Sequence, residues 1–237
     1  MIKDQTYIVT GSSSGIGQAI SELLLKKGAK IIGISRNKSK FKNVKNFFHY
    51  QIDLSNIENT YTQILNILNS GVRIDGLISN AGNGLFQSLE NFSPIQINDF
   101  IKLNLTSHII VTRALLPHFK KNKKGIIIYI GSESGIKGKK YGSLYSSCKF
   151  GLRGFSQSIR EEASKSNIKV SIINPGMVST SFFDKLDFQP GTNLNEFIKS
   201  TDIGMIVIDM LKSRQGIVIE EINVAPLKKV IKFNKNI

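Results

Sequence analysis

Short apolar runs alternate along the chain with longer segments in which apolar residues recur every three or four positions. The short runs are predicted strands, and two of them, Lys30–Ser35 and Ile126–Ile130, are apolar at nearly every position. Such continuous runs are typical of strands that are buried on both faces of a parallel sheet. The predicted strands are Thr6–Thr10, Lys30–Ser35, Phe47–Gln51, Gly76–Ser79, Gly125–Ile130, Lys169–Ile173 and Gly216–Ile222.

The longer segments are predicted amphipathic helices. Their alternation with strands indicates an α/β protein, with a Rossmann-like, doubly wound parallel sheet of about seven strands and helices on both faces. A ligand of such a sheet binds at the carboxyl ends of the strands. There is no low-complexity linker and no internal repeat, so residues 1–237 are expected to form a single domain. The predicted helices are Ile16–Lys27, Ile57–Leu68, Ile97–Lys121, Ser143–Lys165 and Asp202–Leu211.

The composition excludes several classes of protein. A chain that is 41% hydrophobic can bury a sizeable core, so it is neither disordered nor collagen-like. One cysteine cannot form an internal disulfide, and beside three scattered histidines it makes no metal-ligand cluster. No apolar run approaches the roughly 20 residues that span a bilayer. A predicted strand at Thr6–Thr10 leaves no room for a signal peptide, so we expect a soluble, cytoplasmic protein.

The chain is strongly basic, with 32 Lys and Arg against 17 Asp and Glu and a net charge of +15. Such a surface can attract nucleic acid or an anionic membrane. The basic residues are scattered, however, and no aromatic residues suited to stacking on bases lie between them. We therefore expect neither partner and interpret the charge as a solvated lysine-rich surface. The clusters are Lys26/Lys27, Lys120–Lys124, Lys137–Lys140 and Lys228–Lys235.

A glycine- and serine-rich loop joins the first predicted strand to the first predicted helix. Glycines there let the backbone turn tightly and approach a pyrophosphate, which binds at the positive end of the helix. The spacing is G-x-x-x-G-x-G, not the G-x-G-x-x-G of the general dinucleotide fingerprint. The predicted phosphate-binding residues are Gly11, Ser12, Ser13, Ser14, Gly15, Ile16 and Gly17.

Tyr145 and Lys149 carry the clearest chemistry. In a helix they are i and i+4 and project from one face. A phenol with a pKa of about 10 is a poor acid–base catalyst at neutral pH, so we expect the neighbouring ammonium of Lys149 to lower the pKa of Tyr145. Tyr145 would then protonate a carbonyl oxygen, or take the proton from an alcohol in the reverse direction. Ser132, 13 positions earlier, offers a hydroxyl to hold the same oxygen.

With these residues in place, the sequence resembles the short-chain dehydrogenase/reductase family over essentially the whole chain. The matching pieces come in the family's order: TGSSSGIG at 10–17, Asp53-Leu54, Asn80-Ala81-Gly82, Asn104, Ser132, Tyr145 with Lys149, and Asn174-Pro175-Gly176. The chain departs from the usual pattern at two positions. Ser79 stands where a second Asn is frequent, and Gly131 where a second Ser is frequent.

The resemblance implies a catalytic set of Asn104, Ser132, Tyr145 and Lys149. It implies that Lys149 also binds the nicotinamide ribose and that Asn104 holds a water linking Lys149 to solvent. It further implies a homodimer or homotetramer assembled through Ile97–Lys121 and Ser143–Lys165. Beyond the glycine loop, the implied cofactor-binding residues are Ser35, Arg36, Asp53, Leu54, Asn80, Ala81, Gly82, Tyr145, Lys149, Pro175, Gly176, Val178 and Thr180.

The sequence favours NADP(H) over NAD(H). An NAD site uses a carboxylate about 20 residues past the glycine loop to bind the ribose 2′-hydroxyl, yet no acidic residue lies between Glu22 and Asp53. Ser35 stands where NAD-using relatives carry Asp, and Arg36 matches the basic residue of NADP-using relatives. A guanidinium forms charge-assisted hydrogen bonds with a 2′-phosphate. Nearby cations that add long-range attraction are Lys38, Lys40 and Lys42.

The substrate is less closely defined. Residues 178–200 fall where the family places a mobile lid, and Phe182 and Phe183 in it, with Phe86, predict a pocket for a small, partly apolar carbonyl or alcohol. An equal alternative is that the phenylalanines of this segment anchor it to the body of the protein. The predicted function is therefore NADPH-dependent hydride transfer to such a carbonyl. Because the end of the chain, Ile219–Pro226, resembles relatives that oxidise short 3-hydroxy acids, a dehydrogenase of such acids is an alternative. A non-catalytic nucleotide-sensing or nucleic-acid-associated protein is a further one.

Overall fold

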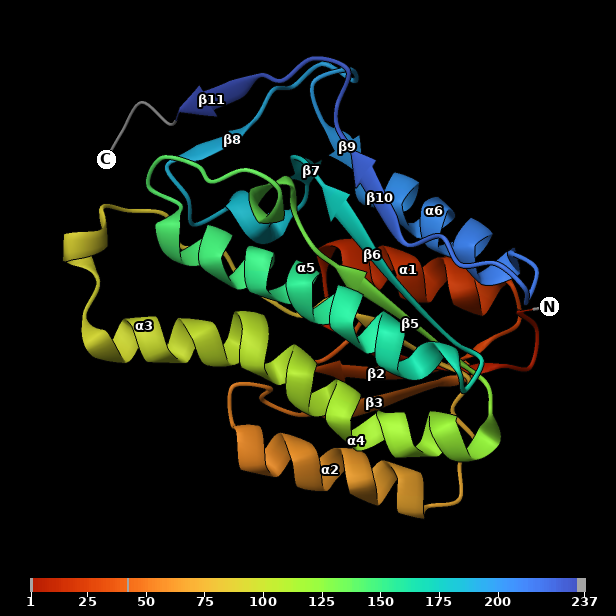
Figure 1. Cartoon of the computed structure of the whole chain (residues 1–237). Coiled ribbons are helices and arrows are strands. Elements are labelled where there is room, and N and C mark those ends of the chain that lie inside the picture. Colours follow the sequence, from red (N-terminus) through yellow and green to blue (C-terminus); the bar gives the residue numbers. More distant parts are fainter. Residues whose placement is uncertain (1, 42, 234–237) are drawn as a thin grey trace.

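The computed structural model describes residues 2–41 and 43–233, and a seven-stranded parallel sheet runs through its centre in the order β10-β6-β5-β4-β1-β2-β3 (Figure 1). The chain builds outward from β1 to β3 on one side and from β4 to β10 on the other. The order therefore reverses between β1 and β4, where a doubly wound sheet binds its ligand. The predicted fold is confirmed. The strands are β1 Thr6–Thr10, β2 Lys30–Ser35, β3 Phe47–Gln51, β4 Gly76–Ser79, β5 Gly125–Ile130, β6 Ile168–Pro175 and β10 Glu221–Val224.

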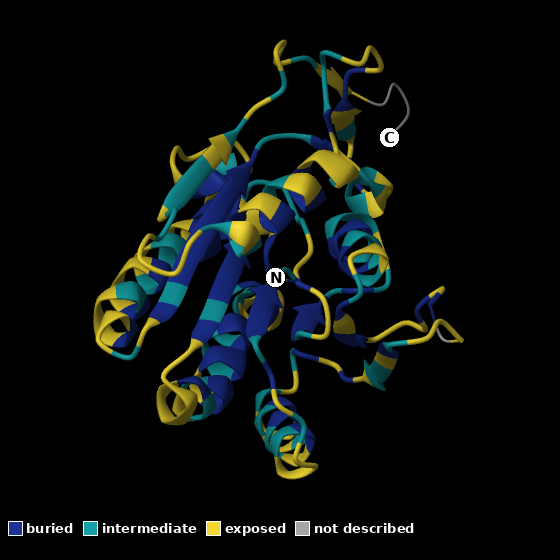
Figure 2. Cartoon of the chain, turned by 90° about the vertical axis from the view of Figure 1, so that its right-hand side faces the viewer, coloured by how far each residue is buried: buried dark blue, intermediate teal, exposed yellow. Residues whose placement is uncertain are grey.

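Helices cover both faces of the sheet (Figure 1). Successive side chains of β1 point in opposite directions, so Ile8 packs into one core while Tyr7 and Val9 pack into the other. The inner strands of the sheet are buried along most of their length, whereas the edge strands β3 and β10 and the outer faces of the helices are more exposed (Figure 2). One face carries α1 (Gly15–Lys26) and α6 (Ser200–Lys212), and the other carries α2 (Ile57–Asn69), α4 (Ser107–Asn122) and α5 (Ser143–Ser164).

The last strand differs from its prediction. Gly216–Ile222 was expected, but β10 comprises Glu221–Val224, because only these residues lie opposite a partner, Ile172–Pro175 in β6. Gly216 lies within a turn, in which the N–H of Ile217 donates to the carbonyl of Arg214. The apolar pattern therefore marked the region of the strand, while the reach of β6 set its limits.

The predicted helix Ile97–Lys121 is also wrong as a continuous α-helix. The segment begins with α3 (Pro94–Ile101), whose first turn is capped by the Ser93 side chain. It then passes through a π-helical turn, η2 (Lys102–Thr106), before α4 begins. A π-helical turn is a frequent device at functional sites, and this one contains Asn104.

The predicted lid, residues 178–200, carries small elements of its own. Its strand β7 (Val178–Ser179) pairs with β9 (Ile198–Lys199), and the short helix η4 (Ser181–Phe183) lies between them in the chain. The strand β8 (Phe188–Pro190) pairs antiparallel with β11 (Ile231–Phe233) from the C-terminal end of the chain (Figure 1). The segment is thus tied to the end of the chain by main-chain hydrogen bonds.

Candidate active site

The expected site residues follow three neighbouring strands. The glycine loop follows β1, Asn80 follows β4 and Ser132 follows β5, and these strands are adjacent in the sheet. Because parallel strands end at the same edge, the three loops meet there. Tyr145 and Lys149 reach the same edge from the first turns of α5.

The glycines of the first loop are required by its geometry. Gly11 has φ +68° and Gly15 has φ +53°, a left-handed conformation that side chains rarely adopt. A Cβ at Gly17 would clash with the carbonyl oxygen of Gly11. The loop therefore packs its backbone directly against the start of α1.

The residues at this end of α1 fit a pyrophosphate. Ser14 is the N-cap, yet its side chain makes no hydrogen bond to the helix, so the first-turn N–H groups are not capped by it. Such N–H groups, at the positive end of the helix dipole, bind anions. A cavity of about 390 Å³ opens beside them. Its lining includes Ser14, Gly15, Gln18, Ser179, Thr180 and Ser181.

Of the predicted residues later in the chain, Thr180 lines this cavity. Pro175, Gly176 and Val178 lie in the segment that leads from β6 to Thr180. Thr180 lies next to Gly15, and its hydroxyl accepts a hydrogen bond from the N–H of Phe182 at 3.3 Å. Gly176 follows β6 and donates its N–H to Val224 at 2.7 Å. Pro175 ends β6 and Val178 begins β7. The structure therefore brings the sequence-predicted residues of both halves of the chain to one edge of the sheet.

Asp53 and Arg36 lie near each other beyond the glycine loop. Partial burial acts to raise the pKa of Asp53, but hydrogen bonds from the N–H and hydroxyl of Ser55, at 3.0 and 2.8 Å, and the charge of Arg36 outweigh it and lower that pKa. Asp53 is therefore a carboxylate at neutral pH. Leu54, beside it, is buried in the core.

The lysines near Arg36 are not all free to attract a ligand. The ammonium of Lys40 lies 3.1 Å from the carboxylate of Glu22 on α1, which offsets its charge. Lys38 is exposed, and Lys42 lies outside the described residues. Among these basic residues, Arg36 is the one that directly follows β2.

Lys149 is a buried cation. It is 4% exposed, and its Nζ donates a hydrogen bond to the carbonyl of Ile130 at 3.1 Å. The same Nζ lies 5.7 Å from the centre of the Tyr145 ring, so the two side chains do share one face of α5. Burial lowers the pKa of Lys149 to about 8.

Tyr145 does not have the lowered pKa that the sequence predicted. Burial raises the pKa of Tyr145 to about 12, while its hydrogen bond with Ser132 acts in the opposite direction. The prediction was wrong because it considered the charge of Lys149 and not the removal of the phenol from water. In the chain alone, Tyr145 is therefore a protonated phenol at neutral pH.

Asn104 is held by a residue that the sequence argument missed. Its side-chain N–H₂ donates to Asn83 Oδ1 at 2.9 Å and to the carbonyl of Phe100 at 3.1 Å, and its Oδ1 accepts from the N–H of Asn83 at 3.0 Å. Gly82 leaves room for this arrangement, since a Cβ there would lie 2.8 Å from Asn104 Oδ1. The signal for Asn83 was its polar side chain directly after Asn80-Ala81-Gly82.

Aromatic rings enclose Tyr145. Phe86 lies 5.2 Å and Phe182 lies 6.0 Å from it, measured between ring centres. Phe183 packs on Phe182 at 5.1 Å, and Phe188 from β8 packs on Phe86 at 5.1 Å. The three predicted pocket phenylalanines are therefore brought together over Tyr145, and Phe188 joins them.

His108 is one of the three histidines from which the sequence predicts no metal-ligand cluster, and it forms a buried pair with Ser79. Its Nδ1 lies 2.7 Å from the Ser79 hydroxyl, and burial, with the charge of Lys149 acting in the same direction, lowers the pKa of His108 to about 3. The imidazole is therefore neutral.

Gly131, which stands where the family frequently has a second Ser, has a steric reason to be glycine. A Cβ at Gly131 would clash with Asn174 Oδ1.

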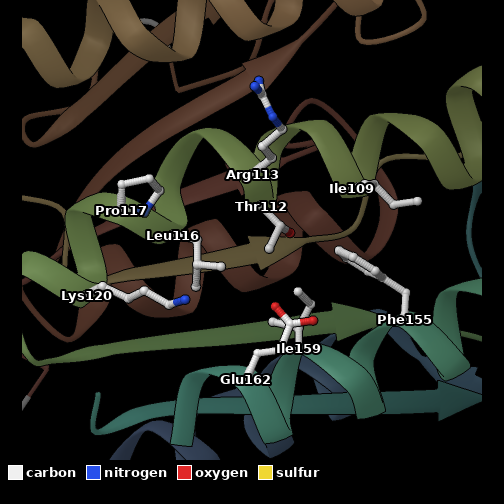
Figure 3. A pocket seen from close by; sticks show the side chains of 9 residues that line it. All are labelled: Ile109, Thr112, Arg113, Leu116, Pro117, Lys120, Phe155, Ile159 and Glu162. Carbon is white, nitrogen blue, oxygen red and sulfur yellow. The ribbon is translucent and has the colours of Figure 1, made fainter. Parts of the chain in front are cut away.

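A second cavity, of about 280 Å³, lies between α4 and α5 and away from Tyr145 (Figure 3). Leu116 and Thr112 on α4 and Phe155 on α5 point into the space between the two helices (Figure 3). Its remaining lining residues are Ile109, Arg113, Pro117, Lys120, Ile159 and Glu162.

Residues 2–41 and 43–233 lack two further kinds of feature. Within them, no helix combines the length and the apolar character needed to cross a bilayer. The same residues hold no group of three or more His, Cys, Asp or Glu side chains suited to a metal ion. Cys148, inside the Tyr145–Lys149 turn, is a buried free thiol.

Comparison with known proteins gives concordant results. Residues 5–190 match the short chain dehydrogenase family. The chain is 35% identical over 191 residues to the 3-oxoacyl-acyl-carrier-protein reductase of Buchnera aphidicola subsp. Acyrthosiphon pisum, with 78% of each chain covered. The alcohol dehydrogenase of the archaeon Thermococcus sibiricus, solved with 5-hydroxy-NADP, has a TM-score of 0.86 at 22% identity, over 96% of this chain and 99% of that one. A metagenomic short-chain oxidoreductase solved with NADP has a TM-score of 0.82 at 27% identity, over 96% of this chain and 99% of that one.

Replacing Lys149 by Met should stabilise the ligand-free protein at pH 7, by about 1–3 kcal/mol, because the lowered pKa of Lys149 reflects the cost of burying its ammonium. The folded state binds this proton less tightly than the unfolded state. The penalty is therefore complete below pH 8 and shrinks as the pH rises from about 8 toward 10.5. Urea unfolding of wild type and K149M at pH 7 and pH 10 measures both effects.

The exposed Lys27, replaced by Met, serves as the control and should change stability by less than about 0.5 kcal/mol. A K149M protein that is less stable than wild type at pH 7 would contradict this account of the buried charge.

Proposed function

The chain belongs to the short-chain dehydrogenase family, and on that premise we propose that it is an NADP(H)-dependent oxidoreductase acting on a carbonyl or secondary alcohol. The observation that carries the proposal is the placement of Ser132, Tyr145 and Lys149 together, buried, at the edge of the sheet that also holds the glycine loop. Its substrate is small and partly apolar, because phenylalanines surround Tyr145.

NADPH, once held by the glycine loop and Arg36, would supply the hydride that the carbonyl carbon receives. Tyr145 donates its phenolic proton to the carbonyl oxygen, so that the carbonyl becomes an alcohol. Ser132 donates a hydrogen bond to the same oxygen and stabilises the negative charge that develops there. The ammonium of Lys149 stabilises the phenolate that remains on Tyr145. We assign to Asn104 the water through which Lys149 exchanges protons with solvent.

The charge state of Tyr145 in the chain alone is that of an acid. With a pKa of about 12, the phenol carries its proton at neutral pH. Reduction uses this protonated form and oxidation uses the phenolate, so the same residues serve both directions.

A dehydrogenase of short 3-hydroxy acids stays the second candidate. The Buchnera relative is named as a reductase of 3-oxoacyl groups, and reduction of a 3-oxoacyl group gives a 3-hydroxyacyl product. NADPH oxidation measured against ketones, aldehydes and oxo acids separates the two candidates. A non-catalytic sensor is disfavoured, because Asn104, Ser132, Tyr145 and Lys149 are all present and buried at one site.

We assign residues 178–200 the role of a lid. Phe182 in this segment packs against Tyr145, which is 8% exposed, and Phe183 packs on Phe182. A substrate therefore reaches Tyr145 only when the segment moves, and its return excludes water from the reacting atoms. The pairing of β8 with β11 makes the C-terminal end of the chain part of the same lid.

Replacing Tyr145 by Phe should lower turnover by about 10²–10⁴-fold while the fold and NADPH binding persist, because only the transferable proton is lost. Steady-state kinetics on a substrate of the wild type, with NADPH titrated by fluorescence, measures both quantities. Tyr61 on α2, beneath the Arg113 side chain, supplies the matched control Tyr61→Phe. Comparable activity in Y145F and wild type would show that Tyr145 is not the acid.

NADPH should bind more tightly than NADH, and Arg36→Ala should weaken NADPH by about 10–150-fold while changing NADH little. A hydrogen bond to a charged group contributes about 1.5–3 kcal/mol, and Arg36 is the cation that follows β2. Adding Ser35→Asp should reverse the preference, since a carboxylate accepts the ribose 2′-hydroxyl and repels a phosphate. Paired titrations of the three proteins test this, and a wild type that prefers NADH refutes the cofactor assignment.

The cavity between α4 and α5 supports assembly through these helices (Figure 3). Its lining is mostly apolar, which suits contact with a second copy of the chain. We therefore expect a dimer or tetramer in light scattering at micromolar concentration, and a smaller species when Leu116 is replaced by Glu. Val44→Glu, at an exposed position before β3, is the control and should keep the wild-type mass. A monomeric wild type would exclude this assembly.

A further inference from the structure

His49 on β3 contacts the end of β2, where the cofactor specificity of the proposed function resides. Its Nε2 lies 2.9 Å from the hydroxyl of Ser35. The same hydroxyl lies 2.8 Å from the main-chain carbonyl of Asn37, two residues further on. Ser35 is 6% exposed, so water has little access to it as an alternative partner.

The two contacts fix which group donates to which. A serine hydroxyl has one proton, and a carbonyl oxygen only accepts. Ser35 therefore donates to Asn37, and His49 Nε2 carries a proton and donates to Ser35. The result is a directed chain of hydrogen bonds from His49 through Ser35 to Asn37.

This chain holds the turn that presents Arg36. The carbonyl of Asn37 is tied back to β2, and β2 is tied through Ser35 to the side chain of its neighbour β3. Arg36 lies between the two ends of this tie, close enough to Asp53 to lower the pKa of that carboxyl. A guanidinium binds a phosphate well only where its backbone is fixed, because ordering a free loop costs binding free energy.

A second polar group lies on the same face of β2. The hydroxyl of Ser12 is fully buried and has no hydrogen-bond partner among the described residues. The Ser12 hydroxyl would lie 2.7 Å from a Cβ built at Gly33. Gly33 is two residues before Ser35 and lies opposite His49 in the pairing of β2 with β3. Ser12, Ser35 and His49 thus line one side of the strand pair where it meets the glycine loop.

We propose that His49 is a specificity-determining positioning residue for NADP(H), acting through Ser35 on the turn that carries Arg36. The inference rests on the proposed cofactor, and it assigns to β3 a part in reading the 2′-phosphate. His49 itself need not touch the ligand. It supplies the hydrogen-bond donor that leaves the Ser35 proton directed at Asn37.

The test uses two fragments of the cofactor, 2′,5′-ADP and 5′-AMP, which differ only in the 2′-phosphate. Calorimetric titration should show that the wild type binds 2′,5′-ADP more tightly. His49→Leu removes the donor and should weaken 2′,5′-ADP by about three- to tenfold, as expected for one hydrogen bond, with less than a twofold effect on 5′-AMP. His49→Gln keeps an N–H donor and should restore most of the loss. His118→Leu, a substitution at a similarly half-buried histidine on α4, should leave both affinities unchanged.

A double-mutant cycle with Ser35→Ala separates positioning from general destabilisation. Ser35→Ala should reproduce the loss of 2′,5′-ADP affinity, and adding His49→Leu to it should cost nothing further. Ser35→Ala and His49→Gln keep the test available should His49→Leu fold poorly in a thermal melt, because neither of them contains that substitution.

The proposal is overturned if His49→Leu leaves 2′,5′-ADP binding unchanged, or weakens both ligands equally. It is also overturned if the effects of His49→Leu and Ser35→Ala simply add. A wild type that does not distinguish 2′,5′-ADP from 5′-AMP would instead refute the NADP(H) assignment on which the inference rests, so the two failures are distinguishable.

Discussion

The Thr10 hydroxyl joins the two strands on which the whole site depends. It accepts hydrogen bonds from the N–H of Asn80 at 2.9 Å and of Ala81 at 3.0 Å, and the Asn80 side chain donates back to the Thr10 carbonyl at 3.0 Å. These bonds lock the glycine loop to the loop after β4, at the reversal of strand order. Gly82 then sits against Asn104, whose amide binds Asn83. The glycine loop and the η2 turn that carries Asn104 are thereby linked through a few hydrogen bonds made by side chains.

The same site trades stability for chemistry. Lys149 is buried with one hydrogen bond to a carbonyl, and Tyr145 is covered by aromatic rings, so burial acts against the charged form of each. A buried, weakly polar environment also strengthens every charge interaction within it. In the proposed mechanism, the ammonium that is costly in the free protein becomes effective once a negative charge develops on the neighbouring phenol. The aromatic rings around Tyr145 contribute to this environment, because they bury the phenol.

Local pattern was sufficient for most of the architecture and failed where the backbone depends on distant partners. Five predicted strands have the observed limits, since an apolar run such as Gly125–Ile130 ends where its polar turn begins. The limits of β10 depend instead on how far β6 extends. The π-helical turn at Asn104 has no periodicity of its own that distinguishes it from the helices on either side. The raised pKa of Tyr145 likewise depends on phenylalanines from three separate segments, Phe86, Phe100 and Phe182.

The sequence by itself determined the α/β class, the order of the motifs, and the residue types to which we assign phosphate binding and proton transfer, because each is encoded within a few neighbouring positions. The tertiary structure alone decided which side chains meet across strands and loops. Ser35 meets His49 only because β2 and β3 pair in one register. Phe188 covers the site only because β8 pairs with β11. Register and packing are properties of the folded chain, since they depend on contacts between segments that no local pattern brings together.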